Sequence, residues 1–336
     1  MKRNKSLLLI IAVLILALLF LIALSVVLSA GKTDAGTTTG SSNTTPSTHP
    51  TQTETEPTSS TGPSDPEPTE PTPPATEPPP PPTDPNNEYI GNLYTREQLE
   101  AMDTKTYTYG PGVASNGNRP EIPLDLQNYY GKYNANFIAP DNGNIYLTFD
   151  CGYEYYAKDE QGNQYRVTER ILDVLKEKNV KAVFFITMSF AKNQSDLVRR
   201  MIDEGHTVGN HSYNHLVMSD LTIDKMVYEV MSVHEYVLEH YNYEMTLFRP
   251  PTGAYSTQSL AVLQSLGYKN VHWSFAYVDW ETDNQPTEEN ALNTIKSRVH
   301  SGAIYLLHTV STTNAKVLDD AIDFFRAEGF NLELFQ

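Results

Sequence analysis

Cysteine is almost missing from this chain of 336 residues, because Cys151 is the only one. An internal disulfide is therefore excluded. Positive charge is also sparse: 24 Lys and Arg stand against 41 Asp and Glu, and no cluster of Lys and Arg occurs after residue 6. A chain with this charge balance is a poor nucleic-acid binder, so no nucleic-acid partner is expected.

Charge is absent altogether from the apolar run at residues 7–29. As a helix this run would span about 34 Å, enough to cross a bilayer. The alternative, a cleaved signal peptide, has a shorter apolar core. Positive residues precede the run at Lys2, Arg3 and Lys5. The sequence therefore predicts a cytoplasmic N-terminus at 1–6, a signal anchor at 7–29 and an extracytoplasmic remainder.

Residues 30–88 contain little that could form a core. Residues 31–88 hold 15 of the 22 prolines, and Thr, Ser and Glu make up most of the rest. Such a segment buries too little apolar surface to offset its chain entropy, which predicts a disordered linker. Proline runs such as Pro78–Pro82 favour an extended chain, so the linker would act as a long tether for the domain that follows it.

The remaining residues, 89–336, are numerous enough for one large core. Residues 89–142 are rich in Tyr, Asn, Gly and Pro and show little periodicity, so an ordered but irregular arm packed on the domain is expected there. From residue 143 on, short apolar runs alternate with segments of helical period. This alternation predicts an α/β fold over 143–336, a distorted or incomplete (β/α) barrel with about six or seven parallel strands.

The expected strands and helices alternate along this domain. Strands are predicted at 145–149, 182–187, 206–210, 246–248, 268–273 and 303–307, and helices at 165–178, 195–204, 222–241, 258–266, 287–300 and 314–328. Polar side chains follow five of these strands directly or closely. Loops at the carboxyl ends of strands are where α/β proteins keep their catalytic and binding residues.

The first strand is followed by Asp150-Cys151-Gly152. Asp150 stands where a parallel strand would end, and Gly152 permits a sharp turn. The alternative is a strand that merely stops at an Asp-x-Gly turn. Two interpretations of Cys151 also stay open: it is a small buried hydrophobic residue, the usual role of a free cysteine, or a metal ligand or reactive thiol.

The later strands end in further polar groups. His211 and His215 are four residues apart, a spacing that places both on one helical face and suits capture of one metal ion; two unrelated surface histidines are the commoner alternative. Arg249 precedes two prolines that fix the backbone, so its side chain could be aimed at a site rather than lie on a surface loop. Asp279 follows another strand, and His308 ends the last one as either a satisfied core residue or an acid/base.

The order of these motifs resembles that of the polysaccharide deacetylase family, the NodB-homology or carbohydrate esterase 4 domain. The motifs are Tyr-Leu-Thr-Phe-Asp-x-Gly-Tyr-Glu at 146–154, Glu-Gly-His-Thr-Val-Gly-Asn-His-Ser at 204–212, Arg-Pro-Pro at 249–251, Val-Asp-Trp at 278–280 and Ile-Tyr-Leu-Leu-His-Thr-Val-Ser at 304–311. The resemblance covers about 143–336. It is strongest to the delta-lactam-biosynthetic branch, the peptidoglycan N-acetylmuramic acid deacetylases.

The resemblance implies a role for each of these residues. Asp150 matches the catalytic base, and Arg249 the residue that orients it. His308 matches the catalytic acid, and Asp279 the residue that pairs with and tunes it. His211 and His215 match the two metal-binding histidines. The substrate-binding positions are matched by Tyr153, Thr252, Trp280 and Leu306. Among the latter, Trp280 and Leu306 match the walls of the acetyl pocket.

Two positions depart from the family's pattern. The family's third metal ligand is an Asp at the position of Cys151. A thiolate could replace it and would favour zinc, so a divalent metal, zinc, on His211, His215 and Cys151 is expected; a weak or absent metal is the alternative. Thr252 stands where many relatives have an aromatic residue. Its backbone N–H can still serve as the oxyanion donor, although the aromatic wall is lost.

Together with the resemblance, the sequence predicts a membrane-anchored, extracytoplasmic hydrolase of amide C–N bonds that deacetylates N-acetylmuramic acid in peptidoglycan. Deacetylation of N-acetylglucosamine in peptidoglycan or another polymer is a second hypothesis. A catalytically inactive glycan-binding module is the third, and the retained acid and base argue against it. The expected partners are a peptidoglycan glycan strand and the membrane, and a monomer is expected.

Overall fold

The structure, a computed structural model, describes residues 93–114 and 117–336. The predicted cytoplasmic segment 1–6, signal anchor 7–29 and linker 30–88 lie outside the described residues. Within the described part of the chain, no helix is both long and apolar enough to cross a membrane.

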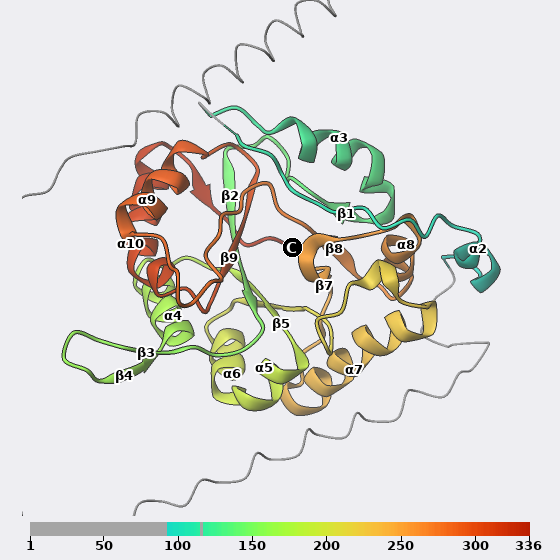
Figure 1. The fold of residues 1–336 in the computed structure, drawn as a ribbon, viewed down its shortest axis with the longest axis horizontal. Helices are drawn as coiled ribbons and strands as arrows, with labels where there is room; N and C mark the ends of the chain where they lie inside the picture. The colour runs from blue at the N-terminus through green and yellow to red at the C-terminus, as the bar shows by residue number, and fades with distance from the viewer. Residues whose placement is uncertain (1–92, 115–116) are drawn as a thin grey trace, which may run out of the picture. The chain divides into compact units, whose positions relative to one another are not determined.

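The centre of the fold is an eight-stranded sheet in which the paired strands run parallel. Strand β2 (Asn144–Cys151) lies between β5 (Val183–Ile186) and β9 (Ala303–His308) (Figure 1). Beyond β5 the order continues through β6 (Thr207–Asn210), β7 (Leu247–Phe248), β8 (Lys269–Val271) and β1 (Ala135–Asn136). Strand β10 (Asn331–Leu332) pairs with the first residues of β2. The predicted parallel α/β sheet is confirmed.

The sheet curls until the segment after β8 meets β9. The N–H groups of Ser274 and Phe275 donate to the carbonyl of Ile304, and the N–H of Leu306 donates to the carbonyl of Phe275. Phe275 and Tyr305 form a parallel bridge at this point. The sheet is thus a curled half-barrel whose ends touch at a short contact, which agrees with the predicted incomplete (β/α) barrel.

Helices surround the outside of the curled sheet (Figure 1). Six of them fall close to their predicted bounds: α4 (Val167–Glu177), α6 (Ser195–Asp203), α7 (Ile223–Tyr241), α8 (Thr257–Ser265), α9 (Glu288–Ser297) and α10 (Thr312–Ala327). Elements that the sequence did not predict are short: α5 (Met188–Asn193), the antiparallel hairpin of β3 (Tyr156–Lys158) and β4 (Gln164–Arg166), and the 3-10 turns η1 (Gly131–Tyr133), η2 (Met218–Asp220) and η3 (Pro251–Gly253). Segments this short carry too few residues to show a period.

The arm before residue 143 is more regular than predicted. It contains α2 (Arg96–Glu100) and α3 (Glu121–Tyr130), and it adds β1 to the edge of the sheet. The side chain of Gln127 on α3 accepts from the N–H of Phe137 and donates to the carbonyl of Ala135, at 2.8 and 3.1 Å. The prediction of an irregular segment is therefore wrong for 121–136, where tertiary contacts to the sheet stabilise a helix and a strand of weak periodicity.

The strands divide their side chains between two cores. On β2, Leu147, Phe149 and Cys151 pack in the core between sheet and helices, whereas Tyr146 packs in the smaller core inside the curled sheet. On β9, Leu306 faces the same inner core. Because successive side chains of a strand point to opposite faces, the alternation directs the side chains of Asp150 and His308 to the inner face at the ends of these two strands.

Candidate active site

Asp150 and His308 are neighbours at the carboxyl ends of adjacent strands. They are register partners in the parallel pair of β2 and β9. Asp150 is 7% exposed, and the side chain of His308 is 22% exposed. A carboxylate and an imidazole therefore open side by side onto the same end of the sheet, as the sequence predicts.

Arg249 keeps Asp150 ionised. Its Nη1 lies 2.8 Å from Oδ1 of Asp150. Burial by itself would raise the pKa of Asp150, but the positive charge of Arg249, with smaller contributions from His211 and His308, outweighs burial and holds the pKa below its ordinary value. The carboxylate is therefore free of its proton at neutral pH, as a general base must be.

The guanidinium of Arg249 is fully buried and has little freedom to move. Its Nε donates to the carbonyl of Val271 at 3.1 Å, and its Nη2 donates to the hydroxyl of Thr148 at 2.6 Å and to the carbonyl of His272 at 3.2 Å. The ring of Phe185 lies 4.3 Å from the guanidinium carbon, within cation–π range. Arg249 thus aims one nitrogen at Asp150 while its other groups are held by the inner core.

His308 has the opposite electrostatic setting. Its Nδ1 lies 2.7 Å from Oδ1 of Asp279, and its backbone N–H donates to Oδ2 of the same carboxylate at 2.8 Å. Burial would lower the pKa of His308, but the negative charge and hydrogen bond of Asp279 outweigh it and raise the pKa above its ordinary value. Nε2 is thus left on the far side of the ring, and the imidazolium form persists to higher pH, as a general acid requires.

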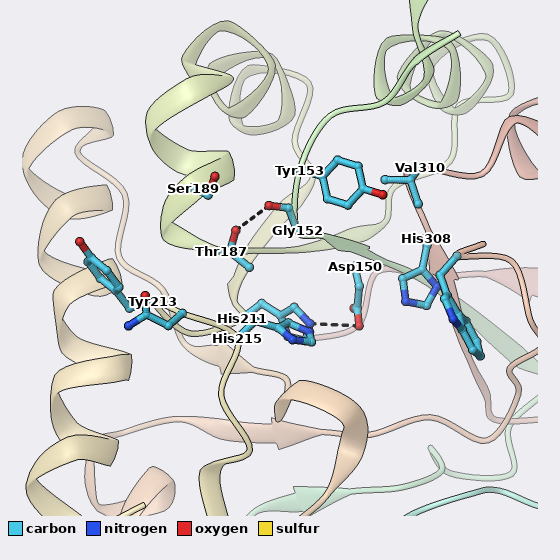
Figure 2. Close-up of a pocket in the computed structure, with 12 residues that line it drawn as sticks. Asp150, Gly152, Tyr153, Thr187, Ser189, His211, Tyr213, His215, His308 and Val310 are labelled. Atoms are coloured by element: carbon cyan, nitrogen blue, oxygen red, sulfur yellow. Dashed lines mark hydrogen bonds and ion pairs between the residues drawn. The ribbon is translucent and has the colours of Figure 1, made fainter. Parts of the chain in front are cut away.

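The two histidines of the 211–215 motif lie on a loop, so the expected helical arrangement is wrong. Ser212 and His215 have positive φ angles of 70° and 58°, which do not occur in a regular right-handed α-helix. The hydroxyl of Ser212 accepts from the N–H of His215 at 3.0 Å, and Asn210 Oδ1 accepts from the N–H of Ser212 at 2.9 Å. This tight turn still brings the two imidazole rings together, with centroids 4.8 Å apart beside Asp150 (Figure 2).

The position of His211 suits a divalent cation. Its Nδ1 lies 2.9 Å from the carbonyl of Arg249, which can only accept, so Nδ1 carries the proton and Nε2 has a lone pair. Nε2 faces Oδ2 of Asp150 at 3.4 Å. Burial lowers the pKa of His211 to about 4, so no proton fills the space between these two acceptors at neutral pH. A cation bound by His211 and His215 would relieve the repulsion between Nε2 of His211 and Oδ2 of Asp150.

A third protein ligand beside the two histidines would come from the His, Cys, Asp and Glu side chains of the described residues. Among residues 93–114 and 117–336, no group of three His, Cys, Asp or Glu side chains is arranged to hold a metal ion. Water or substrate would have to occupy the remaining positions, as they do in catalytic rather than structural zinc sites.

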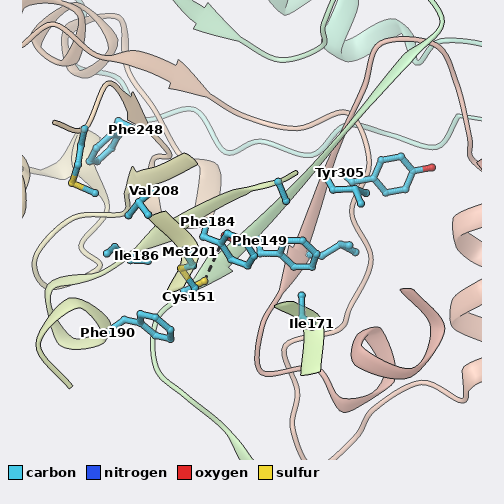
Figure 3. Packing of buried hydrophobic residues seen from close by; sticks show 14 of the residues in the cluster. Phe149, Cys151, Ile171, Phe184, Ile186, Phe190, Met201, Val208, Phe248 and Tyr305 are labelled. Carbon is cyan, nitrogen blue, oxygen red and sulfur yellow. Dashed lines mark hydrogen bonds between the residues drawn. The ribbon is translucent and has the colours of Figure 1, made fainter. Parts of the chain in front are cut away.

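Cys151 does not fit the predicted role of third ligand. It follows Asp150 in the strand, so its side chain points to the opposite face and packs among Phe149, Ile186 and Phe190 in the helix-facing core (Figure 3). It is fully buried, and burial raises the pKa of its thiol well above the ordinary value. Ligation needs a thiolate near the histidines, so the structure supports the alternative of a small buried hydrophobic residue.

The candidate catalytic groups Asp150 and His308 line both of two adjoining pockets, which form two lobes of one cleft. Both lobes are lined by Asp150, His211, His215, Trp280 and His308. The first lobe, about 580 Å³, adds Tyr153, Thr187, Ser189 and Tyr213 (Figure 2) and also Asn214. The apolar lobe, about 570 Å³, adds Thr252, Trp273, Ala276, Val278 and Leu306. All four predicted substrate-binding residues therefore line the cleft, and Trp280 and Leu306 share the apolar lobe that would suit an acetyl group.

Thr252 has an unusual backbone in this lobe. Its φ angle is +61°, a left-handed conformation that β-branched residues rarely adopt. Gly253 follows with φ +72°, and a Cβ on it would lie 2.4 Å from Cη2 of Trp273. Strained backbone of this kind clusters at functional sites, which agrees with an expected backbone contribution of Thr252 to the cleft.

Comparison with known proteins connects this geometry to a family. The polysaccharide deacetylase profile matches residues 138–271. The peptidoglycan-N-acetylmuramic acid deacetylase PdaA of Bacillus subtilis is 39% identical over 238 residues, which cover 70% of this chain and 87% of PdaA. The chain belongs to the polysaccharide deacetylase family. The predicted family is confirmed, and so is a hydrolase that removes N-acetyl groups.

A solved structure of PdaA and one further deacetylase show the range of similarity. The structure of Bacillus subtilis PdaA, described as a family 4 carbohydrate esterase, matches with a TM-score of 0.63 at 37% identity and covers 69% of this chain and 95% of that one. The peptidoglycan-N-acetylglucosamine deacetylase PgdA of Listeria monocytogenes is 30% identical over 192 residues, which cover 57% of this chain and 38% of PgdA. The chain thus spans well under half of PgdA.

Several polar residues that support this deacetylase site escape sequence reasoning. Nδ2 of Asn314, at the start of α10, donates to Oδ2 of Asp279 at 2.6 Å, and Gln285 donates to the carbonyl of Asp279 at 2.7 Å. Thr148 connects Arg249 to the carbonyl of Tyr305. The sequence offers one weak signal, the placement of Thr148 on the same strand face as Asp150; for Asn314 and Gln285 it offers none.

Proposed function

We propose that this chain is a membrane-anchored, extracytoplasmic peptidoglycan deacetylase that acts on N-acetylmuramic acid whose stem peptide has been removed. One observation carries the proposal: Asp150 and His308 sit on neighbouring strand ends, with the pKa of the carboxyl lowered and that of the imidazole raised. Such a divergence is the signature of a base and an acid assigned to different steps.

The chemistry follows from the two protonation states. Asp150 removes a proton from a water molecule whose oxygen attacks the acetyl carbonyl carbon. The backbone N–H of Thr252 stabilises the negative charge that develops on the carbonyl oxygen. As the C–N bond breaks, His308 donates its proton to the leaving nitrogen, which gives acetate and a free amine. When bound by His211 and His215, a divalent metal supplies Lewis-acid polarisation of water and carbonyl.

The lining of the cleft is suited to a sugar substrate. Tyr153 and Trp280 are 52% and 47% exposed on its lining, so both offer ring faces to a glycan. The apolar walls formed by Trp280 and Leu306 suit the methyl of an acetyl group. The muramic acid preference is taken from the name of PdaA. Deacetylation of N-acetylglucosamine is the alternative because PgdA, a related protein, carries that name.

The membrane part of the proposal comes from the sequence. The uncharged run at 7–29 would anchor the chain, and the proline-rich residues 30–88 would let the domain reach the cell wall. The acidic chain, with a formal charge of −17, favours a glycan over a nucleic acid as its partner.

Product analysis tests the proposed substrate. The full chain is incubated with peptidoglycan before and after an amidase removes the stem peptides, and the glycan fragments are examined by mass spectrometry. We expect loss of acetyl groups from muramic acid in the amidase-treated sample. Acetyl loss confined to glucosamine would contradict the muramic acid preference and support the alternative.

A further inference from the structure

Helix α7 carries a buried carboxylate that the reaction does not use. Glu229 has no exposed surface, while the neighbouring buried positions Met226, Val227, Val230 and Val233 are apolar. A buried carboxylate is costly unless hydrogen bonds and charges compensate for its lost hydration. Packing of α7 on the sheet does not require such a group, so the hydrogen-bond partners of Glu229 indicate what its side chain does.

Those partners belong to the histidine loop. Oε2 of Glu229 accepts from the N–H of Asn214 at 2.7 Å, and Oε1 accepts from Nδ2 of the same residue at 2.9 Å. The backbone carbonyl of Glu229 accepts from the N–H of Tyr213 at 2.9 Å. Lys225 lies farther away, with its Nζ 3.8 Å from Oε1. Glu229 thus clamps the two residues that precede His215.

The loop needs such a clamp. Ser212 and His215 both adopt left-handed backbone conformations, which are unfavourable for residues other than glycine. A conformation of this kind persists only when surrounding contacts hold it. The Ser212 hydroxyl supplies one contact inside the turn, and Glu229 supplies three from outside it.

We propose that Glu229 is a positioning residue that holds His215 against His211 and thereby sets the affinity of the histidine pair for a divalent metal. The inference rests on the proposed function, in which these two histidines hold that metal. The side chain of Glu229 acts through Asn214, whereas the bond from Tyr213 goes to the backbone carbonyl, which any residue at 229 would keep. Glu229 does not itself touch the metal or the substrate.

The variant Glu229→Leu distinguishes an effect on the position of His215 from an effect on the stability of the fold. Leu removes the desolvation cost of the buried carboxylate, and the donors it leaves belong to the exposed Asn214 and can bond to water. We therefore expect little change in Tm. Zinc titrated into the full chain, followed by calorimetry, should show a Kd about tenfold or more weaker, the usual effect of losing a group that supports a metal ligand. Hydrogen exchange of peptides covering 211–216 should be faster without added metal.

Two variants serve as controls. Glu229→Gln can keep both side-chain bonds if the amide of Asn214 turns over, so its zinc affinity and loop exchange should stay close to those of the wild type. Glu239→Leu removes an 80% exposed carboxylate from the same helix and should change neither property. A merely structural role for Glu229 would lower Tm without this selective loss of zinc affinity.

The outcomes are distinguishable. Wild-type zinc affinity and loop exchange in Glu229→Leu would overturn the inference. If the wild type binds no zinc, the metal part of the proposed function and the affinity claim are both overturned, while loop exchange still decides whether Glu229 positions the loop. If Glu229→Leu does not fold, Asn214→Ala, at an exposed position, removes the bond from Nδ2 to Oε1 of Glu229 while the bond from the backbone N–H of residue 214 stays. It should therefore give the same two changes in weaker form.

Discussion

Asp150→Asn is expected to reduce turnover by about 10²–10⁴-fold, the usual contribution of a general base. The amide retains an oxygen that can accept from Nη1 of Arg249, but it cannot take a proton from water at neutral pH. Acetate release from peptidoglycan measures the effect directly. The matched control is Asp141→Asn, an exposed residue in the loop before β2, which should keep normal turnover.

Stability must be measured beside activity in this variant. Asp150 neutralises the fully buried guanidinium of Arg249, and removing one partner of a buried ion pair costs up to about 3–5 kcal/mol. The expected result is therefore a lowered Tm with an intact fold by circular dichroism. A folded Asp150→Asn chain with nearly normal turnover would contradict the assignment of Asp150 as the base.

His308→Ala is expected to reduce turnover by a similar factor, about 10²–10⁴-fold. The leaving nitrogen would depart without a proton donor, whereas Asp150 could still activate water. The loss should be seen in acetate release under saturating substrate. His240→Ala, at an exposed histidine in the last turn of α7, is the matched control and should stay active.

The stability of His308→Ala should change less than that of Asp150→Asn. The imidazole is partly exposed, and Asp279 keeps its bonds from the backbone N–H of residue 308 and from Asn314 after the substitution. Near-normal turnover in folded His308→Ala would show that His308 is not the acid and would contradict the proposed function.

The strand ends are the part of the site that a sequence predicts best. Asp150 and His308 each follow an apolar run, and parallel strands must end at the same edge of their sheet, so their proximity follows from topology. The alternation of side chains along a strand also predicts the orientation of Cys151, because successive side chains of a strand point to opposite faces. Cys151 follows Asp150 in β2 and therefore faces away from the site. Similarity to a family with an Asp at that position obscured this rule.

Loops and long-range partners could not be predicted in the same way. The spacing of His211 and His215 is equally compatible with a helix and with a turn, and left-handed φ angles at Ser212 and His215 decide between them. Glu229 and Asn314 lie on helices whose patterns show only which face is apolar. Which loop their side chains reach depends on how helix and sheet pack, information that one sequence does not contain.

The central claim is that a deprotonated Asp150 and a protonated His308 act together, and the pH dependence of kcat/KM tests it most directly. Turnover should fall at low pH as Asp150 gains its proton and at high pH as His308 loses its own. Asp279 raises the pKa of His308, so in Asp279→Asn only the charge of Asp150 still opposes burial and the pKa falls. The account predicts an alkaline limb that moves to lower pH in Asp279→Asn while the acid limb stays in place. An alkaline limb that does not move would contradict it.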